Sequence, residues 1–182
     1  MTKLRRETRE TRISIDVSRS GGPIEVTTDD PFLTHMLETL ARYAGLGLTL
    51  EATGDMRHHL IEDVAIALGL ALTREVPASA ARYGWATVPM DDALVRAAID
   101  VGGRPWYDGT LPWKLWTHFL QSLAFNLGAT LHVVVDRGSD PHHIVEAAVK
   151  ATGLALRQAL ATSGDDGRVF STKGSVKLEW DA

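Results

Sequence analysis

The chain has 182 residues, 45% of them hydrophobic and 23% charged, which is enough apolar material for one well-buried domain and excludes a wholly disordered protein. Its formal net charge of −4 gives no electrostatic footprint for nucleic acid or for an anionic membrane surface. It contains no cysteine, which excludes disulfides, thiolate zinc sites and cysteine nucleophiles.

Hydrophobic spacing predicts the elements of the first half. Apolar residues that alternate with polar ones indicate strands, and apolar residues three or four positions apart indicate helices. A Ser-Gly-Gly-Pro turn at 20–23 favours a hairpin after the first strand, and Asp30 is available as a helix cap. In chain order we predict a strand, the return strand of the hairpin, a helix, a strand and a helix, over residues 11–17, 24–27, 32–43, 45–53 and 58–72.

The second half repeats much of this order. The same patterns predict a strand, a helix, a strand and a helix, over residues 93–101, 116–127, 130–135 and 142–160. We therefore predict an α+β fold in a single domain over residues 1–182, built from duplicated half-domains of strands backed by helices and related by a pseudo-twofold axis. The internal repeat spans about 10–90 and 91–176.

Six of the seven histidines lie at equivalent places in the two halves. Self-similarity of this kind indicates a duplicated functional unit. Each set has one upstream histidine, an adjacent pair 23 or 24 positions later, and a glutamate at a fixed offset from the pair: His35, His58, His59 and Glu62, then His118, His142, His143 and Glu146.

The spacing within each set is suited to metal binding. On a helix the glutamate lies one turn after the histidine pair, so each imidazole can share a face with it. The two adjacent imidazoles diverge by about 100°, so one pair serves two ions on either side more easily than one ion. Split evenly, the two sets give three histidines and one glutamate to each of two ions, with open positions left for catalysis. Mixed nitrogen and oxygen ligands suit Mn²⁺, Fe²⁺, Co²⁺ or Zn²⁺.

Less specific interpretations are open for these residues. One histidine pair at a helix start is more often a cap or a surface feature than a ligand pair, and only its duplication favours the metal. A purely structural ion is a further alternative, although the number of histidines exceeds what a closed tetrahedral site uses.

The duplicated HHxxE helices, which read HHLIED and HHIVEA, resemble those of the imidazoleglycerol-phosphate dehydratase family. The resemblance runs from about Thr8 to Val176. Further stretches that carry it are Thr8–Thr11, His35–Leu37, Arg82–Gly84, Pro89–Leu94, Gly103–Pro105, His118–Phe119, Thr130–His132, Lys150–Ala151 and Ser171–Gly174.

The resemblance implies roles for particular residues. The two histidine–glutamate sets would be the ligands of two Mn²⁺ ions per chain, with other divalent transition metals as alternatives. Glu10 would be an acid that contacts the substrate, and Glu10, Glu62 and Glu146 are the candidates for moving the proton. The substrate phosphate would be held by cationic and hydroxyl side chains, which are the groups that a phosphate dianion requires: Arg82, Arg104, Lys150, Ser171 and Lys173.

The same resemblance implies an activity and a fold. The expected enzyme is a manganese-dependent hydro-lyase of histidine biosynthesis that converts imidazole glycerol phosphate to imidazole acetol phosphate. Each half would have the fold of the second domain of ribosomal protein S5. The expected partners are this small phosphorylated imidazole and further copies of the chain, in a closed assembly of about 24 chains. We expect a cytoplasmic protein with no nucleic-acid or membrane partner, because the N-terminus is no signal peptide and no apolar run reaches the roughly 18 residues of a membrane helix.

Several positions depart from the family pattern, and they leave alternatives open. Thr34, Thr39 and Tyr43 stand where the family usually has an aspartate, a glutamine and a histidine, and the stretches before His58 and before His118 are short. None of these changes removes a predicted ligand, but neighbours of ligands affect metal affinity and activity. A divergent member with an altered substrate, or a non-catalytic metal-binding assembly protein, is therefore the alternative. A dinuclear metallohydrolase ranks lower, because it would use more bridging carboxylates.

Overall fold

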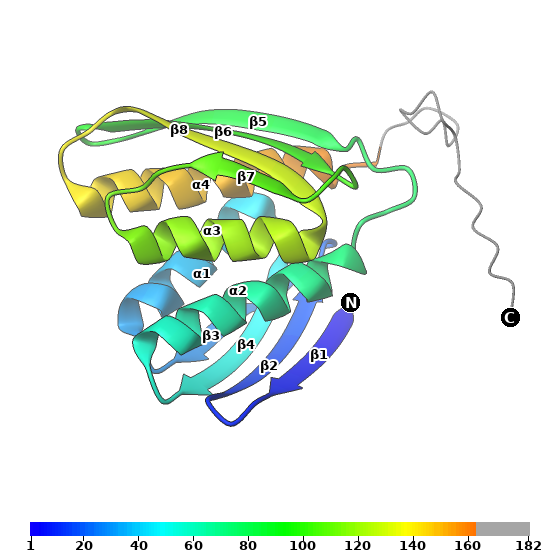
Figure 1. Cartoon of the computed structure of the whole chain (residues 1–182). Helices are drawn as coiled ribbons and strands as arrows, with labels where there is room; N and C mark the ends of the chain where they lie inside the picture. The colour runs from blue at the N-terminus through cyan, green and yellow to red at the C-terminus, as the bar shows by residue number, and fades with distance from the viewer. Residues whose placement is uncertain (163–182) are drawn as a thin grey trace, which may run out of the picture.

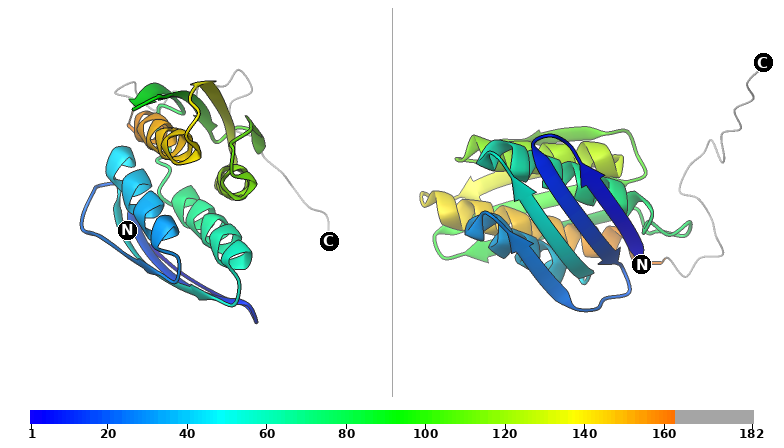
Figure 2. Two further views of the ribbon diagram at one scale, coloured as in Figure 1. Left: turned by 90° about the vertical axis from the view of Figure 1, so that its left-hand side faces the viewer. Right: turned by 90° about the horizontal axis from the view of Figure 1, so that it is seen from below.

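In the computed structural model, which describes residues 1–162, four helices lie between two four-stranded sheets (Figures 1 and 2). The first half supplies, in order, β1 (Thr2–Glu7), β2 (Thr11–Ser18), β3 (Ile24–Thr28), α1 (Pro31–Ala44), β4 (Gly47–Gly54) and α2 (Arg57–Thr73). The second half supplies β5 (Tyr83–Met90), β6 (Ala93–Val101), β7 (Trp106–Gly109), α3 (Lys114–Leu127), β8 (Ala129–Arg137) and α4 (Pro141–Ala159).

The two sheets have the same topology. Their strand orders are β1-β2-β4-β3 and β5-β6-β8-β7, and in each sheet the first two pairings are antiparallel and the last is parallel. Helices α1 and α2 pack on the first sheet, α3 and α4 pack on the second, and α1·α4 and α2·α3 meet between them. The predicted α+β fold of two equivalent half-domains is confirmed.

The predicted hairpin after the first strand is wrong. The strand at Ile24–Thr28 pairs parallel with β4, which separates it from β2. In this register Ile24 and Val26 lie beside Leu48 and Leu50 of β4. Their side chains therefore pack with the hydrophobic core. The turn therefore carries the chain across β4 instead of back along β2.

Three strands have no counterpart among the predicted elements, and all three lie at sheet edges: β1, β5 and β7. Edge strands bury fewer side chains than central ones, so their alternation of apolar and polar residues is weaker. In β1 the charged sequence TKLRRE buries none of its residues fully, and β7 has only 4 residues. In β5 a buried position is occupied by Gly84, whose added Cβ would lie 1.9 Å from the carbonyl oxygen of Ala155 in α4.

All four helices begin at the same end of the molecule, on the left of Figure 1. The predicted cap is confirmed, because the Asp30 side chain accepts from the backbone N–H of Leu33 at 2.8 Å at the start of α1. Asp140 caps α4 in the same way through His142 N–H, also at 2.8 Å. The first turns of the four helices, and with them the predicted ligands, therefore lie together at one end of the core.

Within the described residues, no helix is long and apolar enough to cross a membrane.

Candidate metal centre

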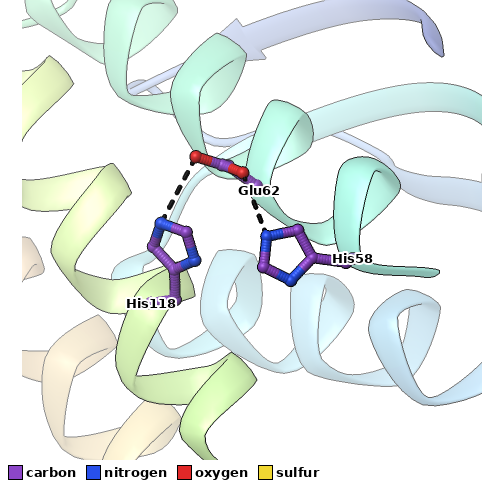
Figure 3. A group of neighbouring side chains, drawn as sticks. All are labelled: His58, Glu62 and His118. Atoms are coloured by element: carbon purple, nitrogen blue, oxygen red, sulfur yellow. Dashed lines mark ion pairs between the residues drawn. The ribbon is translucent and has the colours of Figure 1, made fainter. Parts of the chain in front are cut away.

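A first cluster joins the two halves through His58, Glu62 and His118 (Figure 3). His58 and Glu62 lie one turn apart on α2, and His118 comes from the neighbouring α3. Glu62 Oε2 lies 3.3 Å from His58 Nε2, and its Oε1 lies 3.3 Å from His118 Nε2. One ligand atom from each residue lies within 4.8 Å of the others. Bonds of about 2.0–2.2 Å from nitrogen and oxygen to one ion give ligand separations of this kind, so the cluster fits a transition metal.

A second cluster, formed by His35, His142 and Glu146, is related to the first by the duplication. His142 and Glu146 lie one turn apart on α4, with Nε2 and Oε2 separated by 3.2 Å, and His35 from α1 lies 3.8 Å from the same oxygen. The other oxygen of Glu146 accepts from Lys150 Nζ at 2.8 Å. Burial alone would raise the pKa of Glu146, but the hydrogen bond and charge of Lys150 outweigh it and hold that pKa below its ordinary value.

The remaining two predicted ligand histidines, His59 and His143, turn away from these clusters toward other carboxylates. Each ring lies nearly perpendicular to its neighbour, at 83° to His58 in one case and 84° to His142 in the other. Their Nδ1 atoms lie 2.8 Å from Asp55 Oδ1 and from Asp92 Oδ1, respectively. A carboxylate on Nδ1 fixes the orientation of an imidazole, as in metal-ligand histidines, and His143 Nε2 also lies 3.3 Å from Asp91 Oδ2.

The hydrogen bonds to Asp55 and Asp92 raise the pKa of His59 and of His143 above the ordinary value of 6.5. Asp92 is itself held by the backbone N–H of Ser139 at 2.6 Å, by the Ser139 hydroxyl at 2.9 Å and by the N–H of Asp140 at 3.2 Å. These bonds, together with the one to His143, keep the pKa of Asp92 well below its usual range. Asp92 therefore ties the start of α4 to the imidazole of His143.

We expect Asp92→Asn to lower the pKa of His143 in the metal-free protein, because the substitution removes the anion whose hydrogen bond raises it. A raised pKa means that the imidazole keeps its proton to higher pH, so the proton competes with a metal ion for the nitrogen more strongly than it would at an ordinary imidazole. An NMR titration of the imidazole signals measures the shift. Asp55→Asn is the matched control, since it should lower the pKa of His59 and leave that of His143 in place. A His143 titration that Asp92→Asn does not move would contradict the assignment.

The other predicted site residues are not gathered in one place. Glu10 lies next to the first histidine pair, with Oε2 3.7 Å from His59 Nδ1. Arg82 pairs with Asp100 at 3.0 Å, and the carbonyl oxygen of Arg104 accepts from the Thr130 hydroxyl. Lys150 lies on Glu146, as described above. Ser171 and Lys173 lie outside the described residues.

The residues that depart from the family pattern lie around the second cluster and α1. The Thr34 hydroxyl is 2.9 Å from that of Thr28, and Thr39 is buried in α1. The ring of Tyr43 faces Lys150 Nζ at 5.6 Å from its centroid. All three side chains are accommodated without displacing a histidine or glutamate of the clusters.

Sequence reasoning missed the two carboxylates that hold the outer histidines. Asp55 is only four residues before His59, so its proximity in sequence could have indicated it, although it precedes the start of α2 at Arg57. Asp92 is 51 positions from His143, and no spacing rule connects the two.

Known proteins resemble this chain in sequence and in fold. The family profile for imidazoleglycerol-phosphate dehydratase matches residues 28–156. The chain is 49% identical to the enzyme of that name from Pyrobaculum arsenaticum, over 93% of this chain and 97% of the relative, and 41% identical to the one from Archaeoglobus fulgidus, over 96% and 98%. The structure is similar to that of the enzyme from Pyrococcus furiosus, with a TM-score of 0.85 and 41% identity over 95% of this chain and 100% of the other. A second solved structure, from Staphylococcus aureus, has a TM-score of 0.81 and 31% identity over 89% and 99%.

Proposed function

Because this chain belongs to the imidazoleglycerol-phosphate dehydratase family, we propose that its two histidine–glutamate clusters hold the metal ions of the active site. The chain is a dehydratase of histidine biosynthesis, which converts imidazole glycerol phosphate to imidazole acetol phosphate. The observation that carries the metal proposal is the first cluster, where two imidazoles and both oxygens of Glu62 face one another. When bound, two divalent ions, Mn²⁺ by preference, would supply Lewis-acid polarisation and hold the donor atoms of the substrate in place.

Proton movement falls to the carboxylates beside these ligands. Loss of water requires a group that takes the proton from carbon and a group that returns one to the leaving hydroxyl. Glu10 suits the first task, because its side chain is 54% exposed and lies against His59 at the edge of the predicted site. Glu62 and Glu146 are the alternatives, since each has an oxygen in direct contact with the imidazoles.

The phosphate of the substrate needs several cationic or hydroxyl groups, and we propose Arg82, Arg104, Lys150, Ser171 and Lys173 for this role. Arg82 already pairs with Asp100, and Lys150 already pairs with Glu146. These two would therefore have to share or exchange their carboxylate partners when a phosphate arrives.

We also propose that the enzyme works as a closed homo-oligomer, of about 24 chains as the family resemblance implies. Each inner cluster offers two imidazoles and one carboxylate, whereas an even division of all eight predicted ligands gives every ion three imidazoles. His59 and His143 turn away from the inner clusters. We propose that each of them binds an ion held by the inner cluster of another copy of the chain. A cytoplasmic location stays a prediction of the sequence.

The test is the dehydration of imidazole glycerol phosphate by metal-depleted protein before and after Mn²⁺ is added. We expect no turnover without metal, recovery with Mn²⁺, and about two ions per chain by elemental analysis. His132→Ala is the control. This seventh histidine lies on the exposed face of β8, away from the core, and pairs with Asp108, so its removal should not affect metal content. Full activity in protein shown to be metal-free would contradict the proposal.

A further inference from the structure

The duplication gives two clusters with matching geometry along α2 and α4, although His35 lies 3.8 Å from Glu146 where His118 lies 3.3 Å from Glu62. The histidine–glutamate separations along the helix are 3.3 Å in the first and 3.2 Å in the second. The paired rings have centroids 6.1 Å and 5.9 Å apart. The clusters differ in what each glutamate does with its second oxygen.

In the first cluster, within the described residues, the glutamate pairs only with predicted metal ligands. The two oxygens of Glu62 face two different imidazoles, His58 and His118, at 3.3 Å each (Figure 3). One turn further along α2, on the same face, stands the apolar, half-buried Ile66. The full negative charge of this carboxylate is thus available to an ion.

In the second cluster the position equivalent to Ile66 is Lys150, four residues after Glu146. Both imidazoles approach the same oxygen of Glu146, and the other oxygen is held by Lys150 Nζ at 2.8 Å. The pair is well shielded, since the two side chains are only 9% and 15% exposed. Lys150 Nζ also contacts Met90 Sδ at 3.2 Å and faces the ring of Tyr43. A lysine fixed from three sides differs from the loose surface pairs that contribute little.

We propose that Lys150 makes the two metal positions unequal, so that the ion at the His35–His142–Glu146 cluster is held more weakly than the ion at the His58–Glu62–His118 cluster. The ammonium group occupies one of the two oxygens that Glu146 could offer, and it adds a positive charge beside an incoming cation in a poorly solvated place. The second cluster therefore carries the exchangeable ion, and the first carries the ion that stays. The inference rests on the metal-dependent function proposed above, because it presupposes that both clusters hold ions.

Equilibrium dialysis of the metal-depleted full chain against Mn²⁺, with elemental analysis, tests the proposal directly. We expect the parent protein to bind two ions in two steps whose dissociation constants differ by about tenfold or more. His118→Ala should remove the tighter step, and His35→Ala the weaker one. Lys150→Met should tighten the weaker step about tenfold and bring the two together.

The reciprocal variant, Ile66→Lys, places an ammonium group at the equivalent position of the first cluster and should weaken the tighter step by a similar factor. It keeps the test decisive if Lys150→Met does not fold, since Ile66 is only half-buried. If Lys150 merely supported the position of Glu146, Lys150→Met would weaken the second step, and the inference would be wrong. Two steps of equal affinity in the parent protein would overturn this inference but leave the metal-dependent function standing. A parent protein that binds no Mn²⁺ would overturn the metal-dependent function as well.

Discussion

Glu62→Gln is expected to lower kcat/KM by about 100-fold or more while leaving the metal-free protein as stable as the parent. Glutamine has nearly the same shape but no charge, and it offers one acceptor oxygen where Glu62 presents two to His58 and His118. The Glu62 side chain is 32% exposed, and among residues 1–162 it pairs with those two imidazoles alone. Stability should therefore change by no more than about 0.5 kcal/mol.

Glu146→Gln should behave differently, which makes it the matched comparison. It should also lower kcat/KM, but it leaves the ammonium group of Lys150 without its anion in a site where that side chain is 15% exposed. Removing one partner of such a shielded pair costs about 3 kcal/mol, which corresponds to a fall in Tm of about 6–12 °C for a chain of this size. Steady-state kinetics at saturating Mn²⁺ and thermal melts of the metal-free proteins measure the two effects. Equal melting temperatures for both variants, or an active Glu62→Gln, would contradict this picture of the clusters.

Sequence reasoning was most successful where a segment is buried on one well-defined side. The four helices and the central strands β2, β4, β6 and β8 were predicted within a few residues of their ends. The apolar positions of the strands and of α1, α3 and α4 repeat with a clear period, whereas α2 buries residues on most of its surface. The edge strands β1, β5 and β7 were missed for the opposite reason. The hairpin was wrong because a Gly-Gly-Pro turn reports that the chain changes direction, and pairing partners are decided by where Ile24 and Val26 can be buried.

The candidate site divides in a similar way. Helical spacing led directly to the inner clusters, because His58 with Glu62 and His142 with Glu146 follow the one-turn rule. Spacing carries no information on contacts between distant strands and loops, so Asp92 was out of reach. The ion pair of Lys150 with Glu146 could have been predicted, since the two residues are four positions apart. The family resemblance instead implies that Lys150 binds phosphate. Its pairing with a carboxylate became apparent only from its burial and its neighbours.

The largest structural effect is expected from His59→Ala combined with His143→Ala, which should dissociate the proposed oligomer. These two imidazoles turn away from the inner clusters of their own chain and are each oriented by a carboxylate, as ligands to an ion shared with another copy would be. Without them, each ion loses the third imidazole that an even division provides. Light scattering with elemental analysis should show a small species that has lost most of its metal. His132→Ala, whose imidazole lies outside these contacts, should keep the size of the parent.

Acid should produce the same dissociation in the unmodified protein, and the direction follows from the two raised pKa values. A ligand imidazole must be neutral, and the pKa of His59 and of His143 is raised, chiefly by the hydrogen bonds to Asp55 and Asp92. Protons therefore begin to compete with the metal at a higher pH than they would at an imidazole with an ordinary pKa. The assembly is lost as the pH falls through the raised pKa values of the two histidines. Excess Mn²⁺ should move the transition to lower pH, because the ion and the proton compete for the same nitrogen. An assembly whose size depends on neither pH nor Mn²⁺ would mean that contacts other than these histidines hold the chains together.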